Sequence, residues 1–429
     1  MKKSIKAIAA FSAALTMTFS CIPKAFAVED VPAVHTEAEE EKTGLEFTEG
    51  KTFETPYKGT AEICDENGTA YYSGYDKANR RAVFYTLDEN GEIKNSYFIE
   101  SYVNDKGETI GVANSEIKQC GDDIYILYAE ACGFSMRENV IIKLDKELNE
   151  IARYKAPKCD GVDTNGEKIV YMKNHRTIYS MDMDGKNKKT IFTLGQDNEL
   201  NNMNFIVVSG DYVGFQGSIG DSYVPKNEKD FCGYINLKTG EVTLKEQRSV
   251  QQLYGSNDKI IWYSSEWRDT SESNMITVPE GEDPSEYIRK HDEEHREYFK
   301  DGESYILDNG EYYVLKTQSP NECYELTIDD DGNVITSSYK NGKHIFKFYR
   351  DNKLIDTYSM DLKGYCGFVA NNGVMTICYT GRDMTAEDWV GITASSPEEL
   401  QELQEQLQEQ LDKTPAAKDT IKSVTIYYK

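Results

Sequence analysis

Short stretches of alternating apolar and polar residues recur along most of the chain. Six of them run through a polar turn rich in Asp, Asn and Gly into a second alternating stretch, as in VFYTLDENGEIKNSYFI. Alternation with a period of two predicts half-buried β-strands, and Asp, Asn and Gly readily take the positive φ of tight hairpins. The pattern therefore predicts six β-hairpins, which begin at Val83, Val140, Ile178, Gly233, Ser304 and Ile345.

A further short strand, often aromatic, precedes most of these hairpins, as in DIYILYAE and KIIWYSS, and a shorter segment precedes each of those strands. Each repeat thus holds four strands, A and B followed by the C–D hairpin. Four-stranded repeats of about 40 to 50 residues are typical of a β-propeller. The sequence therefore predicts an all-β propeller.

A seventh unit lacks the hairpin. GYCGFVANN and GVMTICYTG supply strands A and B, SVTIYYK near Lys429 supplies strand C, and LEFTEGKTFETPY from Leu45 is free to supply strand D. We expect seven four-stranded blades, closed by strands from both termini because closure removes exposed sheet edges. Strand boundaries are the least reliable part of such a prediction, so six and eight blades stay open as alternatives.

One repeat, KIVYMKNHRTIYSMDMDGKNKKTIFTL from Lys168, resembles the repeats of TolB-like and low-density-lipoprotein-receptor-like β-propellers of secreted bacterial proteins. The Tyr-Trp-Thr-Asp signature of the receptor branch is absent, and IIWYSS is the nearest approach to it. The resemblance implies the propeller fold and partner binding, and it brings no catalytic residue to this chain.

The N-terminus carries a secretory signal. Three lysines precede the apolar stretch Ala7–Phe19, and Ala25-Phe26-Ala27 is a small-x-small cleavage site, so residues 1–27 form a signal peptide cleaved after Ala27. A lipoprotein anchored at Cys21 is the less favoured alternative. Residues 28–44 are acidic without an aromatic residue and predict a disordered linker, which leaves 45–429 for the propeller.

The chain is strongly acidic, with a net charge of −26. The signal peptide holds four lysines and no acid, so its removal lowers the net charge to −30. Such a charge excludes nucleic acid as a partner and favours neutral or cationic ones. We expect an extracellular glycan, peptide or protein as partner, no membrane span and no cofactor. Eight further cysteines permit disulfides, whose pairing their spacing does not reveal.

The fifth and seventh blades are interrupted between strands B and C. Each insertion contains a capping box with Pro at the first helical position, Asp283-Pro284-Ser285-Glu286 and Ser396-Pro397-Glu398-Glu399, which predicts short helices over about 283–300 and 396–412. An apolar stripe on the second helix packs on the propeller or on a partner; it consists of Leu400, Leu403, Leu407 and Leu411.

Both insertions leave the same end of the propeller, and large loops on a rigid scaffold commonly carry function. The candidate ligand-binding residues at this end are Trp267, Trp389, Arg268, Arg382 and Tyr287. The two tryptophans either stack on a sugar ring or peptide, or fasten the insertions to the propeller.

His291-Asp292-Glu293-Glu294-His295 matches the H-x-x-E-H signature of zinc peptidases. His291 and His295 share a helix face and could hold a metal ion, but the peptidase needs a large α/β domain. A packed helix is therefore favoured over a metal site, and catalysis is disfavoured. The calcium-like stretches DMDG and DDDGN are explained by turns.

The sequence thus favours a secreted, non-catalytic binding protein that uses the end with the insertions. The alternative is an extracellular carbohydrate-active enzyme with carboxylates at the mouth of the central channel. Paired carboxyl groups with raised pKa values would favour the enzyme, and aromatic residues without such a pair would favour the binding protein.

Overall fold

The computed structural model describes residues 44–132, 135–194, 202–219, 229–246, 250–256, 259–264, 267–268, 287, 290, 299–300, 304–308, 310–315, 325–340, 343–351, 353–362, 364–380 and 420–429. The predicted signal peptide, Cys21 and almost all of the linker lie outside them. Two compact units are distinguished: Met1–Ser101, Tyr339–Phe346 and Asp356–Lys429 form unit 1, and Tyr102–Ser338 and Lys347–Ile355 form unit 2.

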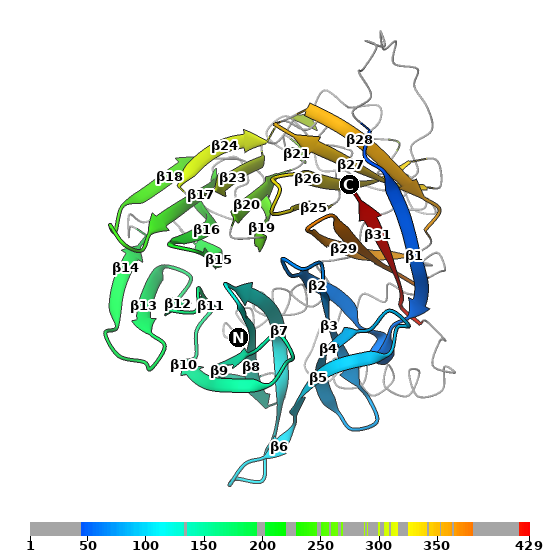
Figure 1. Cartoon of the computed structure of the whole chain (residues 1–429). Coiled ribbons are helices and arrows are strands. Elements are labelled where there is room, and N and C mark those ends of the chain that lie inside the picture. Colours follow the sequence, from blue (N-terminus) through cyan, green and yellow to red (C-terminus); the bar gives the residue numbers. More distant parts are fainter. Residues whose placement is uncertain are drawn as a thin grey trace. The chain divides into compact units, whose positions relative to one another are not determined.

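The described strands form six four-stranded sheets, one five-stranded sheet and one separate two-stranded sheet. The seven larger sheets are the blades, so the prediction of a seven-bladed β-propeller is confirmed (Figure 1). Blade 1 consists of β2 (Thr60–Cys64), β3 (Ala70–Asp76), β4 (Arg81–Leu87) and β5 (Ile93–Glu100). Blade 2 consists of β6 (Tyr102–Val103), β7 (Thr109–Cys120), β8 (Asp123–Cys132), β9 (Ser135–Leu144) and β10 (Glu150–Ala156).

Blades 3 to 6 follow in chain order. Blade 3 consists of β11 (Gly161–Thr164), β12 (Lys168–Lys173), β13 (Thr177–Asp182) and β14 (Lys189–Thr193), and blade 4 of β15 (Asn202–Ser209), β16 (Tyr212–Ile219), β17 (Lys229–Asn236) and β18 (Val242–Glu246). Blade 5 consists of β19 (Val250–Ser256), β20 (Lys259–Ser264), β23 (Ser304–Asp308) and β24 (Glu311–Leu315). Blade 6 consists of β25 (Glu325–Ile328), β26 (Val334–Lys340), β27 (Lys343–Arg350) and β28 (Lys353–Met360).

Blade 7 is shared between the two ends of the chain, as the sequence predicts. Its strand order is β1 (Phe47–Glu54), β31 (Lys422–Tyr428), β30 (Val374–Tyr379) and β29 (Tyr365–Asn371). Strand β1 pairs antiparallel with β31, and Phe47 lies opposite Tyr428. The N-terminal segment therefore supplies the outer strand D that this blade lacks.

The two predicted helical insertions are not supported. The described elements comprise strands and one short 3-10 turn, η1 (Pro56–Lys58). In the first insertion Tyr287 and Lys290 have helical backbone, while Phe299–Lys300 form strand β22, which pairs with β21 (Trp267–Arg268). The prediction of a helix up to residue 300 is wrong there, because Phe favours a strand once a partner strand is present. Residues 396–412 lie outside the described part.

One turn recurs at the hairpins. An Asp or Asn accepts a hydrogen bond from the N–H three residues on, and its side-chain oxygen accepts N–H groups two and four residues on, as Asp88 does from Asn90 and Glu92 at 2.8 and 2.9 Å. The backbone part of this pattern repeats at Asp65, Asn104, Asp145, Asp182 and Asp329. The stretches DMDG and DDDGN are two of these turns, which confirms that they serve turn formation.

The core lies between the faces of neighbouring sheets within each unit. Trp262 of β20 is fully buried, and its indole N–H donates to the carbonyl of Phe215 on β16 at 3.1 Å. This bond joins blades 4 and 5 and satisfies the one polar group of the largest fully buried side chain.

The cysteines whose side chains are described form no disulfide; they are Cys64, Cys120, Cys132, Cys159, Cys232 and Cys378. The side chains of Cys323 and Cys366 lie outside the described part. Within the described residues, no helix has the length and apolar character needed to cross a membrane.

Two glycines in equivalent turns provide a test of this packing. Gly68 and Gly107 both have φ of +78°, but an added Cβ would lie 2.5 Å from Val374 Cγ2 at Gly68 and would meet nothing within 4 Å at Gly107. We expect Gly107→Ala to lower the free energy of unfolding by about 1–2 kcal/mol through backbone strain, and Gly68→Ala by roughly 1 kcal/mol more through overpacking. Urea denaturation measures both, and equal losses would show that Val374 does not confine the turn.

Candidate functional site

Most of the residues singled out in the sequence lie outside the described part of the chain. Trp267 and Arg268 form β21, whose side chains are not described, and Tyr287 is half-buried. The remaining candidates lie outside the described residues: Arg382, Trp389, His291, His295, Leu400, Leu403, Leu407 and Leu411. None of the proposed roles is therefore tested.

The most distinctive described feature is an extension of blade 2. Strands β7, β8 and β9 have 12, 10 and 10 residues, whereas β12 and β13 of blade 3 have 6 each. The excess lies at the B–C end, where Cys132 pairs with Ser135. Four extra residues lengthen a strand by about 13 Å. The fifth strand, β6, borders β7 at this end, so that the β6–β7 hairpin projects from blade 2 (Figure 1).

Polar contacts hold this extension in place. Asn104 begins the β6–β7 turn, and its side-chain oxygen accepts the N–H groups of Lys106 and Glu108 at 2.9 and 3.0 Å. The amide of Asn104 and the guanidinium of Arg137 on β9 both donate to Glu108 Oε2, at 2.7 and 2.6 Å. These two donors lower the pKa of Glu108. The turn is thus tied to the neighbouring β8–β9 hairpin.

The extension also presents apolar side chains to solvent. Tyr102 and Val103 of β6 are 48% and 66% exposed. The Tyr102 hydroxyl donates to Glu130 Oε2 on β8 at 3.1 Å, and burial and this hydrogen bond raise the pKa of Tyr102. Sequence analysis missed this hairpin, although its signal is present: Tyr and Val favour strands, and the Asn-Asp-Lys-Gly that follows is the same turn as in the other hairpins.

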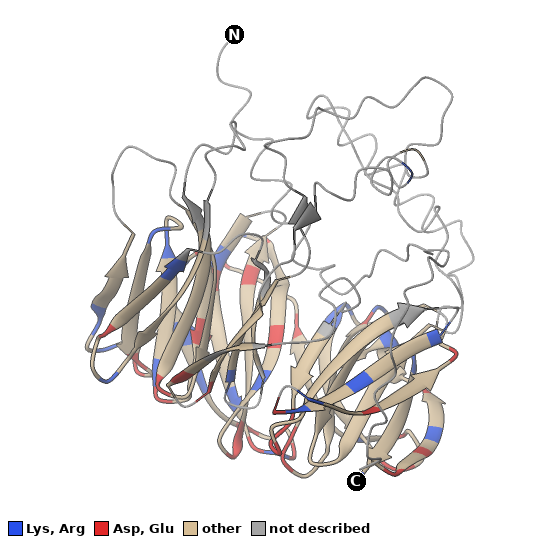
Figure 2. Ribbon diagram, turned by 90° about the horizontal axis from the view of Figure 1, so that it is seen from above, with Lys and Arg blue, Asp and Glu red and all other residues tan. Residues whose placement is uncertain are grey.

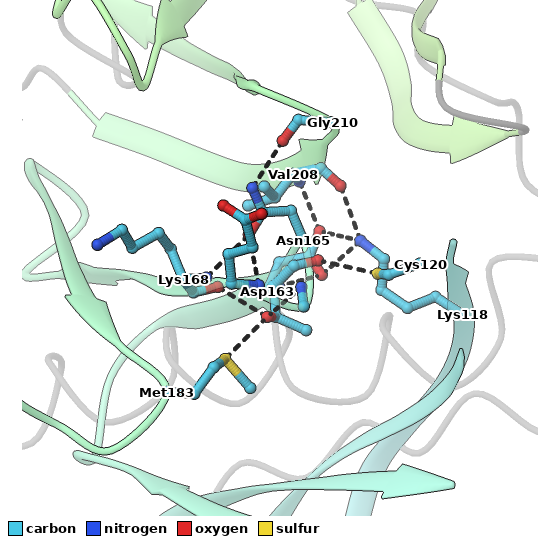
Figure 3. A network of polar contacts seen from close by, with 11 residues as sticks. Lys118, Cys120, Asp163, Asn165, Lys168, Met183, Val208 and Gly210 are labelled. Carbon is cyan, nitrogen blue, oxygen red and sulfur yellow. Dashed lines mark hydrogen bonds and ion pairs between the residues drawn. The ribbon is translucent and has the colours of Figure 1, made fainter. Parts of the chain in front are cut away.

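A buried ion pair joins the inner strands of blades 2, 3 and 4 (Figure 3). The Lys118 ammonium donates to both carboxylate oxygens of Asp163, at 2.7 and 2.9 Å, and to the carbonyl of Val208 at 2.7 Å. Asp163 also accepts the N–H groups of Thr164 and Val208. Burial alone would lower the pKa of Lys118, but the Asp163 carboxylate outweighs it and raises that pKa.

This ion pair is structural rather than catalytic. All three ammonium hydrogens of Lys118 have acceptors, and both oxygens of Asp163 accept two hydrogen bonds. A lysine that acts as nucleophile or base needs a lowered pKa, whereas the pKa of Lys118 is raised. The network therefore fixes the three inner strands relative to one another.

Cys159 precedes Asp160, whose carboxylate lies beside His175, and these are the residue types of a thiol nucleophile with its base. His175 Nε2 lies 3.9 Å from Asp160 Oδ1, and His175 Nδ1 lies 3.1 Å from the carbonyl of Met203. Burial, however, raises the pKa of the Cys159 thiol to about 12, and Asn139 Nδ2 lies 3.1 Å from its sulfur. An active thiol needs a lowered pKa, so this group is not an activated nucleophile.

The pKa values of the described carboxyl groups likewise do not suit catalysis by a general acid. Each described Asp or Glu with a shifted pKa has it lowered, mainly by hydrogen bonds from neighbouring donors: Asp76, Asp88, Glu108, Asp145, Asp182 and Asp184. Asp and Glu are spread over strands and turns, with Lys and Arg among them (Figure 2). Across the described part, no three His, Cys, Asp or Glu side chains are grouped to hold a metal ion.

Comparisons with known proteins show no family for this chain. No protein-family model and no curated protein matches the chain. Among solved structures, the Cps50 (Swd1) β-propeller domain of Myceliophteria thermophila is 10% identical, with a TM-score of 0.44 over 78% of this chain and 96% of that one. This likeness assigns no function to the chain.

Two further solved structures that match are those of enzymes. An oligogalacturonate lyase of Vibrio parahaemolyticus is 10% identical, with a TM-score of 0.40 over 77% of this chain and 79% of the lyase. The acylaminoacyl peptidase of Pyrococcus horikoshii is 15% identical, with a TM-score of 0.32 over 63% of this chain and 49% of the peptidase. TM-scores below 0.5 carry no inference about activity.

The buried ion pair gives a matched stability test. Lys118→Met leaves the buried Asp163 carboxylate without its partner, and we expect a loss of about 3–5 kcal/mol in the free energy of unfolding. Lys155→Met is the control, because Lys155 pairs with Glu138 at the same distance of 2.7 Å but with side chains 68% and 51% exposed. We expect that variant to lose under about 1 kcal/mol. Similar losses in urea denaturation would contradict a structural role for Lys118.

His344 predicts a pH dependence of stability. It is 5% exposed, and burial lowers its pKa to about 4, against about 6.5 in an unfolded chain. Above pH 6.5 the His344 side chain is neutral in both the folded and the unfolded state, so it does not change the free energy of unfolding. Between pH 6.5 and 4 the unfolded state binds a proton that the folded state does not, which destabilises the fold by roughly 3 kcal/mol. We expect His344→Leu to lose less stability than wild type over this range, and parallel pH profiles would refute the assignment.

Proposed function

We propose that the chain is an extracellular, non-catalytic binding protein that engages its partner at the B–C end of its blades. The extension of blade 2 supports this proposal most directly. Fixing the backbone of one residue costs about 1–2 kcal/mol of conformational entropy. The β6–β7 hairpin is nevertheless ordered, and Tyr102 and Val103 remain 48% and 66% exposed. Because Tyr102 and Val103 stay exposed in an ordered hairpin, we infer that they serve to contact a partner.

The residues singled out in the sequence remain candidate contacts of a partner. Trp267 and Arg268 begin the insertion of blade 5, at the end of unit 2 from which the β6–β7 hairpin also projects. Trp389, Arg382 and Tyr287 remain predicted ligand contacts, and the leucine stripe from Leu400 to Leu411 remains a predicted partner surface. Metal binding by His291 and His295 is the least favoured role.

Export rests on the signal peptide predicted for residues 1–27, with cleavage after Ala27. The TolB-like or receptor-like type of the repeats likewise remains a prediction. Both agree with a secreted propeller whose function is to bind.

The alternative is a carbohydrate-active enzyme with paired carboxylates. A general acid of this kind needs a raised pKa. The described carboxyl groups with shifted pKa values have them lowered, as Asp182 does beside Lys168, and this favours the binding protein.

A photo-crosslinker placed at two exposed tyrosines tests the proposed surface. We expect p-benzoylphenylalanine in place of Tyr102 to capture a partner at the surface of the producing cells, because that side chain projects from the extension. The same group in place of Tyr427, which is 47% exposed on β31, is the matched control. Mass spectrometry of the adducts identifies glycan or polypeptide. Capture at Tyr427 alone, or equally at both positions, would place the binding surface elsewhere.

Affinity electrophoresis through gels that hold neutral and charged polysaccharides separates the two functions. We expect no polysaccharide to be shortened. Retardation together with shorter products would establish the enzyme and overturn the proposal.

A further inference from the structure

Strand β6 borders the inner strand β7, and its free edge differs from the outer edges of the seven blades. Strand β6 ends the five-stranded sheet, whose order is β10-β9-β8-β7-β6. A strand at the end of a sheet exposes backbone N–H and C=O groups, and proteins commonly protect such edges with charged side chains or proline. Every outer strand of the blades carries at least one charged residue: β1, β5, β10, β14, β18, β24 and β28. Strand β6 consists of Tyr102 and Val103 and carries none.

We propose that the edge of β6 is a docking site for an extended segment of another polypeptide, which adds to the sheet as a sixth strand. This inference rests on the proposed binding function and names the class of partner. Main-chain hydrogen bonds to the edge would supply affinity, and the side chains of Tyr102 and Val103, which lie on opposite faces of the sheet, would contact alternate side chains of the added strand.

The polar groups favour a polypeptide over a glycan. The Tyr102 hydroxyl already donates its hydrogen bond to Glu130. Its proton is therefore not available to a sugar hydroxyl. The charged pairs of the extension are also satisfied within it, as Arg137 is by Glu108 and Lys155 by Glu138. What the edge offers is the backbone and two side chains that favour strands.

The occupant differs from a second copy of this chain. Two chains that each carry a net charge of −26 repel one another, which opposes pairing of two β6 edges. The same charge favours an uncharged or basic segment. We therefore expect a neutral or lysine-bearing segment rich in Val, Thr and Tyr.

The extension is prepared for such a partner. The turn at Asn104 and the ion pair between Glu108 and Arg137 fix β6 against β7 before binding. A preformed edge reduces the ordering cost of association. The added strand alone would then have to become ordered.

The test uses a fluorescent peptide of alternating Thr and Val with two lysines at each end. Its control is the same peptide with Pro at two alternate positions, which removes ladder donors. Fluorescence anisotropy measures binding to the mature chain and to three variants. We expect Val103→Thr to bind as wild type does, and Val103→Lys to bind at least roughly tenfold more weakly, because it places a charge on the edge. Ile151→Lys, on β10 at the other end of this sheet, should bind as wild type does.

The outcomes separate the two proposals. Equal binding of the two peptides, or no effect of Val103→Lys, would overturn strand addition. Dimerisation of wild type in sedimentation, lost in Val103→Lys, would also overturn it and make a second copy the occupant. A glycan crosslinked at Tyr102 without peptide binding would remove this inference and leave the proposed binding function standing. Absence of both a crosslinked partner at Tyr102 and peptide binding would overturn the proposed binding function and this inference together.

Discussion

The hairpins of this protein depend on one small interaction, in which an Asp or Asn side chain accepts the backbone N–H groups of the turn that it begins. At Asp88 the carboxylate receives two such hydrogen bonds, and the Asn104 amide oxygen does the same at the hairpin that projects from blade 2. A turn held in this way sets the register of the two strands that it joins. Register in turn decides which side chains face the neighbouring sheet, as those of Trp262 and Phe215 do. Part of the acidic composition is therefore architectural.

The side chains that could take part in catalysis are held in unreactive states by hydrogen bonds or by burial. The Lys118 ammonium is fully bound by Asp163 and Val208, the Cys159 thiol is kept protonated by burial, and the shifted carboxyl groups are stabilised in their charged form. Each of these settings opposes reactivity, because a base, a nucleophile or a general acid needs the opposite shift. Within the described residues, polar groups serve packing and strand pairing, while apolar groups at the tip of blade 2 are presented to solvent.

Much of the fold could be predicted from sequence, since strand alternation and turn chemistry are local signals. The sharing of blade 7 between β1 and β31 followed from counting strands, without any contact in view. The β6–β7 hairpin escaped because a strand of two residues, Tyr102 and Val103, is too short to alternate visibly. Phe299 was assigned to a helix because its pairing with Arg268 spans an insertion and depends on a partner strand some thirty residues away. The main described residues of the candidate site, Tyr102 and Val103, were missed for the first of these reasons, since their pairing with Ile110 and Thr109 is local.

The sharing of blade 7 also constrains when the protein can finish folding. Residues Phe47–Glu54 find their partner only in Lys422–Tyr428, so β1 stays without this neighbour until β31 has been synthesised. Pairings between such distant segments form slowly. Blade 7 therefore closes later in folding than the blades whose four strands follow one another in the sequence.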